Sequence, residues 1–280
     1  GGADITDIEI PDTVNTIACG VFEQNTSLKT IVIPQSVHTL GERAFYKMPA
    51  LISIEFLHTQ TDSLRNMVSV KSTGTAGTLS AVFSPSVFVF IAQNSDMAEE
   101  VRGWFATYGF LRHMVFAKDA LDIKEDCVFN LSGDTLIIYK GAATSYTVPA
   151  EVKTIGRNAF DGNATLTSID FNKVENIGNY AFQNSKITQI VFPQQIKEIS
   201  SWAFNGAQMT SLVFENCAVN IGENAFNNCT NITSIDFGNN ILSIGYGAFM
   251  CAGNGIDSII LPASITYIGE SAFEDADIDT

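Results

Sequence analysis

Apolar residues recur along the chain in two alternating phrases separated by polar turns. The first phrase begins with Ile or Leu, continues through a Gly-led stretch and ends in Ala-Phe. Six intact copies end at Phe45, Phe160, Phe182, Phe226, Phe249 and Phe273, and two degenerate copies end at Phe22 and Phe204. Val21 replaces Ala in one altered copy, and Ser200 replaces Gly in the other. Within each run the copies are 22 to 24 residues apart, which is the period of a solenoid built from short rungs.

The second phrase reads apolar-x-x-apolar-x-apolar and is often followed by Pro. Its copies end at Ile10, Ile33, Phe56, Phe171, Phe192, Phe214, Phe237 and Leu261. The last two apolar positions are two apart, as in a strand with one face toward the core, so stacked rungs predict a parallel sheet. Pro ends the strand because it has no N–H to donate.

The rest of each rung closes the repeat. A Val-x-x-Ile step after the strand is expected to return the chain across the solenoid, and Gly permits the bend that follows. We expect the Ala-Phe pair to pack a short helical turn inward. In the next turn lie Asn25, Asn163, Asn184 and Asn228, where Asn tolerates left-handed geometry and can bond neighbouring backbone groups.

The repeat is absent from Leu57 to about Thr135. Within this interval, residues 87–91 have the apolar run of a buried strand, and Ser95-Asp96 predicts the start of a helix. Val115-Phe116 predicts a closing strand. Because the last rung of a solenoid exposes its core, a unit of different composition is expected to cover it.

These patterns predict three segments. A first array covers residues 1–57, an irregular segment with a cap-like strand-helix-strand covers 58–118, and a second array covers 119–280. The two arrays lie either as separate bodies in tandem or in one continuous solenoid from which the insertion bulges. Separate bodies are favoured, because the insertion has its own strand and helix pattern and could close the first array.

Together the two phrases resemble the BspA-type leucine-rich repeat family of cell-surface proteins from bacteria and some parasitic protists. The resemblance covers Ile5 to Phe56 and Val148 to Phe273, and residues 87–116, with Trp104, resemble the strand-helix-strand that often ends such arrays. It implies an α/β leucine-rich-repeat solenoid with a parallel β-sheet and a mid-chain α+β cap. It also implies a cell-surface or secreted adhesin whose partner is a host or microbial surface protein, with a glycan as the alternative. Repeats on both sides of the cap depart from a simple family member.

The charge and hydropathy of the chain limit the classes of partner that it is expected to bind. The 280 residues include 30 acids and 15 bases, for a net charge of −15, which disfavours nucleic acid and anionic membranes. No run of about 18 apolar residues is present, so direct membrane insertion is not expected. The first residues lack the regions of a signal peptide, and we favour a targeting segment that has been removed over a cytosolic chain.

Little in the chain indicates catalysis. The five cysteines have no CxxC spacing or neighbouring His cluster, so no metal site and no cofactor are expected. Cys229 and Cys251 follow the Ala-Phe phrase, where packing of a small buried thiol is favoured over a disulfide or catalysis. His38 and His58 are interpreted as solvated loop residues. The chain is therefore interpreted as a binding protein rather than an enzyme.

Two surfaces are candidates for binding. Alternate strand residues should point outward, and in the second array they predict a ligand face formed by Asp170, Val191, Val213, Asp236 and Ile260. The competing interpretation is that β-branched residues simply favour strands. The alternative surface is an aromatic platform for sugars, formed by Tyr180, Trp202 and Tyr246 in the variable positions before Ala-Phe, unless that face is half buried.

Overall fold

The computed structural model describes residues 5–59, 89–107, 114–124 and 126–278, and excludes the side chains of 103–107 and 114. Val87 and Phe88 of the predicted strand, and the side chain of Trp104, lie outside these described residues. The chain divides into two compact units, residues 1–131 and 132–280. The boundaries predicted at residues 57 and 118, and the choice between separate bodies and one continuous solenoid, stay predictions.

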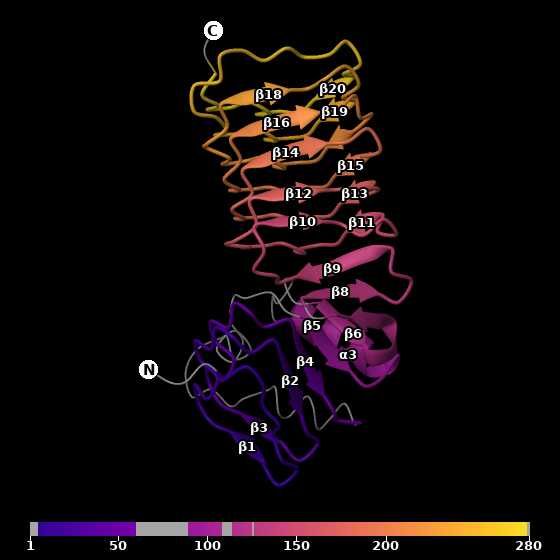
Figure 1. Cartoon of the computed structure of the whole chain (residues 1–280), viewed down its shortest axis with the longest axis vertical. Coiled ribbons are helices and arrows are strands. Elements are labelled where there is room, and N and C mark those ends of the chain that lie inside the picture. The colour runs from indigo at the N-terminus through magenta and orange to yellow at the C-terminus, as the bar shows by residue number, and fades with distance from the viewer. Residues whose placement is uncertain (1–4, 60–88, 108–113, 125, 279–280) are drawn as a thin grey trace. The chain divides into compact units, whose positions relative to one another are not determined.

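The unit of residues 132–280 is a parallel-sheet solenoid, as the repeat predicts. The apolar-x-x-apolar-x-apolar phrases that end at Phe171, Phe192, Phe214 and Phe237 form four strands of a five-stranded sheet on one side of the stack, and the strand before them is the fifth (Figure 1). In order, its strands are β10 (Ser145–Thr147), β12 (Ser168–Asp170), β14 (Gln189–Phe192), β16 (Ser211–Phe214) and β18 (Ser234–Asp236). Side chains alternate along β14 between exposed and buried, which places Ile190 and Phe192 in the core.

The Val-x-x-Ile step does more than return the chain, because its last residues form a second parallel sheet on the other side of the stack (Figure 1). Its strands in this unit are β9 (Thr135–Tyr139), β11 (Thr154–Ile155), β13 (Asn176–Ile177), β15 (Glu198–Ile199), β17 (Asn220–Ile221), β19 (Ser243–Ile244) and β20 (Tyr267–Ile268). In this second sheet, every strand except β9 has only two residues in this unit, which is too short for a period-two pattern to be recognised in the sequence.

The Ala-Phe segments are successive turns, so the expectation of a short helical turn was wrong. Ala159 N–H donates within its turn to Gly156 O at 3.3 Å, whereas Phe160 N–H donates to Ala181 O of the next rung at 2.7 Å. Asn158, which precedes Ala159, also donates to the next rung, at Asn179 O (3.1 Å), and has a left-handed φ of 58°. Because alternate N–H groups bond to the next rung, a helical i to i−4 ladder cannot form.

Phenylalanine rings fill the core in two columns. Along the Ala-Phe column, rings of neighbouring rungs stack with centroids 4.6 to 5.3 Å apart and planes within 4 to 9° of parallel. The strand column, which includes Phe192 and Phe214 at 4.7 Å, meets the first column edge to face. Both arrangements are favourable for aromatic pairs, so each rung fixes the register of the next.

The last rung departs from the repeat. The strand predicted to end at Leu261 does not form, and Ile256 makes only an isolated bridge with Ile278. Gly253 and Gly255, with φ of 99° and 68°, redirect the backbone just before it, and the sheet ends at β18.

In the unit of residues 1–131, the strands form two parallel sheets and an antiparallel pair. The four-stranded sheet runs β2 (Thr30–Ile33), β4 (Ser53–Phe56), β5 (Val89–Ala92) and β6 (Met114–Ala117), and the two-stranded sheet pairs β1 (Thr16–Ile17) with β3 (Thr39–Leu40). A short η1 (Lys118–Ala120) leads to the antiparallel strands β7 (Leu121–Ile123) and β8 (Cys127–Asn130). Because β5 pairs in parallel with β4, the strand-helix-strand continues the sheet of the first array.

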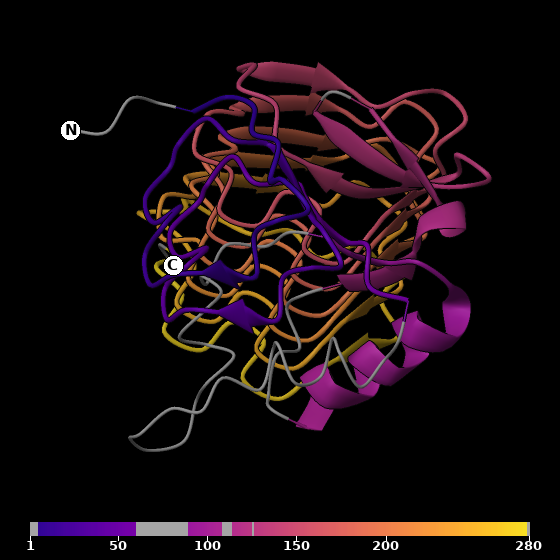
Figure 2. The same ribbon diagram turned by 90° about the horizontal axis from the view of Figure 1, so that it is seen from below.

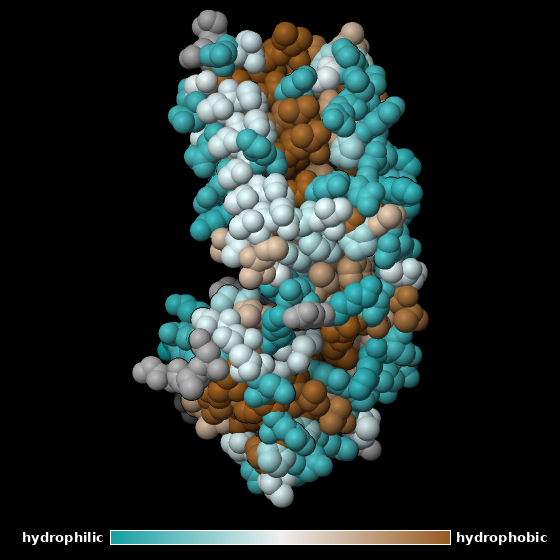
Figure 3. Space-filling model, in the orientation of Figure 1, coloured by the Kyte–Doolittle hydropathy of each residue, from teal (hydrophilic) through white to brown (hydrophobic). Residues whose placement is uncertain are grey.

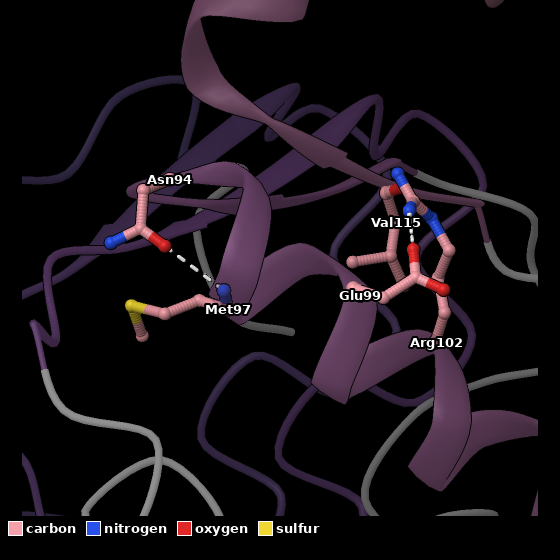
Figure 4. Close-up of polar contacts among 5 residues, drawn as sticks. All are labelled: Asn94, Met97, Glu99, Arg102 and Val115. Carbon is pink, nitrogen blue, oxygen red and sulfur yellow. Dashed lines mark hydrogen bonds and ion pairs between the residues drawn. The ribbon is translucent and has the colours of Figure 1, made fainter.

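In the part of this unit that the structure describes, helix α3 (Ser95–Thr107) packs along β5 and β6 (Figure 2). Its cap is Asn94, whose Oδ1 accepts the Met97 N–H at 2.9 Å, so the cap lies one residue before the predicted Ser95-Asp96 (Figure 4). Arg102 pairs with Glu99 at 2.6 Å and donates from Nε to Val115 O at 3.0 Å, which fastens the helix to β6 (Figure 4).

Candidate functional site

The outward row of the five-stranded sheet contains four of the five predicted ligand-face residues. Val191 pairs with Val213, and Val213 pairs with Asp236. Ser168 pairs with Gln189, which places Asp170 at the same level on the strand before Val191. Val191 is 47% exposed and Val213 is half-buried. In this unit an apolar strip bordered by polar surface runs over the strands β14, β16 and β18 (Figure 3).

The fifth residue does not join the row. Ile260 is 82% exposed but lies outside any strand, because the last rung leaves the sheet after β18. The face therefore comprises Asp170, Val191, Val213 and Asp236, which we call the sheet row.

The two acids of the sheet row also shape the backbone. Asp170 Oδ1 accepts the Asn172 N–H at 2.8 Å, and Asp236 Oδ1 accepts the Gly238 N–H at 2.9 Å. Each carboxylate thus stabilises the turn that follows its strand. Both side chains are on exposed residues, and an ionised carboxylate can accept several hydrogen bonds, so each still offers negative charge and acceptor capacity to a partner.

The predicted aromatic platform has a different geometry from the one expected. Tyr180 and Trp202 stack with centroids 6.3 Å apart, and the Arg157 guanidinium lies 5.1 Å from the Tyr180 centroid. Arg157 comes from the rung before and Trp202 from the rung after, so the half-buried Tyr180 packs against two neighbours of its own chain. This packing reduces the ring surface on which a sugar could stack.

Tyr246 does not extend this column. In its rung Gly247 has the left-handed φ that Tyr180 and Trp202 have in theirs, at 56°, 59° and 62°. Tyr246 therefore stands one position earlier in the repeat than Trp202, and the three aromatics do not align.

A polar groove near this stack was not anticipated. It has a volume of about 220 Å³ and crosses three rungs of the second sheet, with Asn179, Glu198, Ser200, Ser201 and Asn220 among its lining residues. Ser200 Oγ donates to Glu198 Oε1 at 3.0 Å. The signal for this groove in the sequence is Ser200, which replaces the Gly of the repeat.

The cysteines, all within the described residues, are free thiols. Cys229 is fully buried with its Sγ donating to Phe204 O at 3.1 Å, as expected for a core thiol, and burial raises its pKa to about 12. Burial also raises the pKa of Cys217 to about 11. Cys251 is half-buried, with a left-handed φ of 53°, so it does not belong to the core as predicted. Thiols with raised pKa are weak nucleophiles near neutral pH.

His58 is buried, so its interpretation as a solvated loop residue was wrong, whereas His38 is exposed. The Nε2 of His58 lies 2.8 Å from Val37 O, and its Nδ1 has no hydrogen-bond partner in the described part of the chain. Burial lowers the pKa of His58, against the bond to Val37, and the nearby His38 lowers it further.

Across the described ranges, no group of three or more His, Cys, Asp or Glu side chains is placed to hold a metal ion. The helical segments that the structure describes are all too short or too polar to cross a membrane.

Stacked rungs of 22 to 24 residues, with a strand, a close-packed Gly and a phenylalanine column, define a leucine-rich-repeat protein. The profile described as "BspA type Leucine rich repeat region" matches six copies at residues 2–72, 137–208 and 153–279. The chain belongs to this family, which confirms the resemblance of its two phrases. Repeats of this class form binding scaffolds that generally bind proteins.

A solved structure shares the fold. A leucine-rich repeat protein from Eubacterium ventriosum matches with a TM-score of 0.52 at 17% identity, over 95% of this chain and 81% of that one. The pneumococcal vaccine antigen PcpA matches at 0.48 and 16% identity, over 96% and 78%. The T. pallidum leucine-rich repeat protein TpLRR matches at 0.41 and 18%, over 57% and 88%. No curated protein matches the sequence.

Proposed function

We propose that this chain is a non-catalytic adhesion module, displayed on or released from a microbial cell, that binds a surface or matrix protein of a host or of another microbe. Membership of a surface-protein repeat family supports the setting, and the sheet row supports the mode of binding. The outward face is rigid and repetitive, which suits an extended macromolecular partner.

The observation that carries the proposal is the pairing of Val191 with Val213 on the outside of the sheet, with Asp170 before them and Asp236 after them. An apolar centre with a polar rim is the usual anatomy of a protein interface. Four adjacent strands at about 4.8 Å give a row of roughly 15 Å, to which the neighbouring rungs add. β-branched residues also favour strands without any ligand, so mutation must separate the two explanations.

The test is surface-plasmon binding of the purified chain to a panel of immobilised matrix proteins at physiological salt. We expect saturable binding to at least one protein, weakened about tenfold or more by the double variant Val191→Glu/Val213→Glu, because two charges would then be desolvated in the interface.

Val32→Glu is the matched control. Val32 is 42% exposed at the equivalent strand position in β2 of the other unit, and its substitution should leave the affinity within about twofold. Circular dichroism must show both variants folded. Binding by the double variant equal to that of the unchanged chain would remove the sheet row from the proposal.

A further inference from the structure

The polar groove on the second sheet, which we call the Ser200 groove, is separate from the sheet row. Glu198 and Asn220 occupy equivalent, exposed positions on the paired strands β15 and β17. Ser200 and Ser201 follow β15, and Asn179 lies in the rung before, so three consecutive rungs contribute to one concave site.

The groove is centred on an exception to the repeat. In the rungs on either side the equivalent residue is Gly, and a Cβ there would lie 2.9 Å from Ile155 O at Gly178 and 2.7 Å from the Ser200 carbonyl carbon at Gly222. Ser200 carries a side chain where both neighbours have none. Its hydroxyl is directed to the Glu198 carboxylate at 3.0 Å, which brings a hydroxyl and a carboxylate together on the outer surface.

The lining selects the chemistry of a ligand. Two hydroxyls and two amides both donate and accept hydrogen bonds, and Glu198 accepts only, while no Lys or Arg lines the groove. An anion finds no positive charge there, and a mainly apolar ligand would leave the hydroxyls and amides without hydrogen-bond partners. A neutral ligand with several neighbouring hydroxyls satisfies these groups best. The volume of about 220 Å³ is below that of pockets for drug-sized ligands, at about 300–1,000 Å³, and suits a single ring.

Two aromatic residues directly follow lining residues of the groove in the chain. The lining residues Asn179 and Ser201 directly precede Tyr180 and Trp202 in the chain. The Cα atom of each aromatic residue therefore lies about 3.8 Å from the Cα atom of a lining residue. Bulky residues seldom adopt the left-handed φ of 59° and 62° found here, and the equivalent positions of the flanking rungs hold Asn158 and Asn224. The same left-handed φ recurs at this position in other rungs, as at Arg43 and Ser271, so it belongs to the repeat and not to the groove alone. Trp202 is half-buried and provides a fluorescent reporter beside the groove.

We propose that the Ser200 groove binds a neutral sugar residue, with Glu198 and the amides of Asn179 and Asn220 bonding to neighbouring hydroxyls. Tyr180 and Trp202, which follow the lining residues Asn179 and Ser201, would lie near the bound sugar, while the Tyr180 ring itself packs with Trp202 and Arg157. This site is independent of the protein-binding sheet row.

The test is a tryptophan-fluorescence and calorimetric titration of the full chain with free glucose, galactose, mannose, fucose, N-acetylglucosamine and N-acetylgalactosamine. We expect at least one sugar to bind saturably, with a dissociation constant on the order of 1 mM. Glu198→Gln should weaken that binding about tenfold, and Ser200→Gly about threefold. The second variant restores the repeat residue, so misfolding does not obscure its result.

Glu223→Gln is the matched control. Glu223 is an exposed acid at the position of Ser201 in the next rung and is not among the lining residues, so its substitution should leave the affinity within about twofold. The double variant Val191→Glu/Val213→Glu should also bind the sugar normally, which separates this site from the proposed adhesion face. The proposal is overturned if no sugar of the panel binds saturably, or if Glu198→Gln and Ser200→Gly bind it as the unchanged chain does.

Discussion

At the scale of single residues, the spacing between rungs decides where Gly is needed. Gly222 has an ordinary φ, yet its Cβ would lie 2.7 Å from the Ser200 carbonyl carbon, so the requirement is close approach rather than backbone freedom. The sequence indicated the bend but not this cause. Asn residues show the same limit: Asn184 is left-handed as anticipated, whereas Asn163 instead accepts the Leu166 N–H at 2.8 Å. Asn favours both the left-handed φ and the side-chain bond to a backbone N–H. The path of the neighbouring rung decides which of the two forms at each position.

Gly222→Ala should destabilise the solenoid by about 1–3 kcal/mol, because the added methyl forces the rung away from its neighbour. Urea unfolding monitored by circular dichroism measures the change. Ser200→Ala is the matched comparison at the same repeat position, where a Cβ is already accommodated, and it should stay within about 0.5 kcal/mol. Equal effects of the two variants would contradict the packing explanation.

His58 gives the first unit a dependence on pH. Its folded pKa is lowered below 6.5 mainly by burial, so the unfolded state binds the proton more readily. The stability associated with neutral His58 is present above pH 6.5 and is lost as pH falls from 6.5 through the lowered folded pKa.

Thermal melts between pH 7.5 and 5 test this expectation. His58→Gln, which can still donate to Val37 O but does not titrate in this range, should flatten the decline, whereas the exposed His38→Asn should retain it. An unchanged decline in His58→Gln would assign the pH dependence to other groups.

At the scale of elements, the length of a strand decided whether its hydrophobic pattern could be recognised in the sequence. The strands of the five-stranded sheet show an alternation around buried residues such as Ile190 and Phe192, and the repeat located four of them, β12, β14, β16 and β18. The two-residue strands of the second sheet show no such period. The Ala-Phe segment misled in another way: its apolar spacing fits one helical turn, but the hydrogen bonds from Phe160 to Ala181 commit its backbone to the next rung. The Ser200 groove follows from that second sheet and was missed with it.

Each phenylalanine of the Ala-Phe column should contribute to the free energy of unfolding according to the number of rings that stack on it. Phe204 is buried between Phe182 at 4.8 Å and Phe226 at 5.2 Å, whereas Phe273 is half-buried and stacks on Phe249 at 5.3 Å. Phe204→Ala should cost about 3–5 kcal/mol, and Phe273→Ala less than half of that. Chemical denaturation of both variants provides the comparison, and equal losses would show that the rungs do not transmit stability through this column.

At the scale of the whole molecule, the period identified the solenoid and its family, but it could not establish how many cooperative bodies the chain contains. The unit of residues 1–131 has a core that joins first-array residues such as Ile54 and Phe56 to Phe90 of β5 and Val101 of α3. Because this core is shared, the strand-helix-strand can close the first array and unfold together with it as one cooperative unit. Repeat stability depends on contacts between neighbouring rungs, so the continuity of those contacts, which no local sequence pattern encodes, decides the question.

The prediction of separate bodies can be tested in the intact chain with two conservative substitutions. Ile54 in β4 and Ile190 in β14 occupy the same repeat position, and both are buried. Removing one methyl by Ile→Val should cost about 0.5–1.5 kcal/mol at either site. For units of this size, such a loss lowers a melting temperature by roughly 2–6 °C. If the arrays unfold as separate bodies, calorimetry should show two transitions, and each variant should lower only one of them. A single transition that both variants lower equally would instead require one continuous solenoid, because a loss confined to one rung can reach the other array only through an unbroken series of coupled rungs.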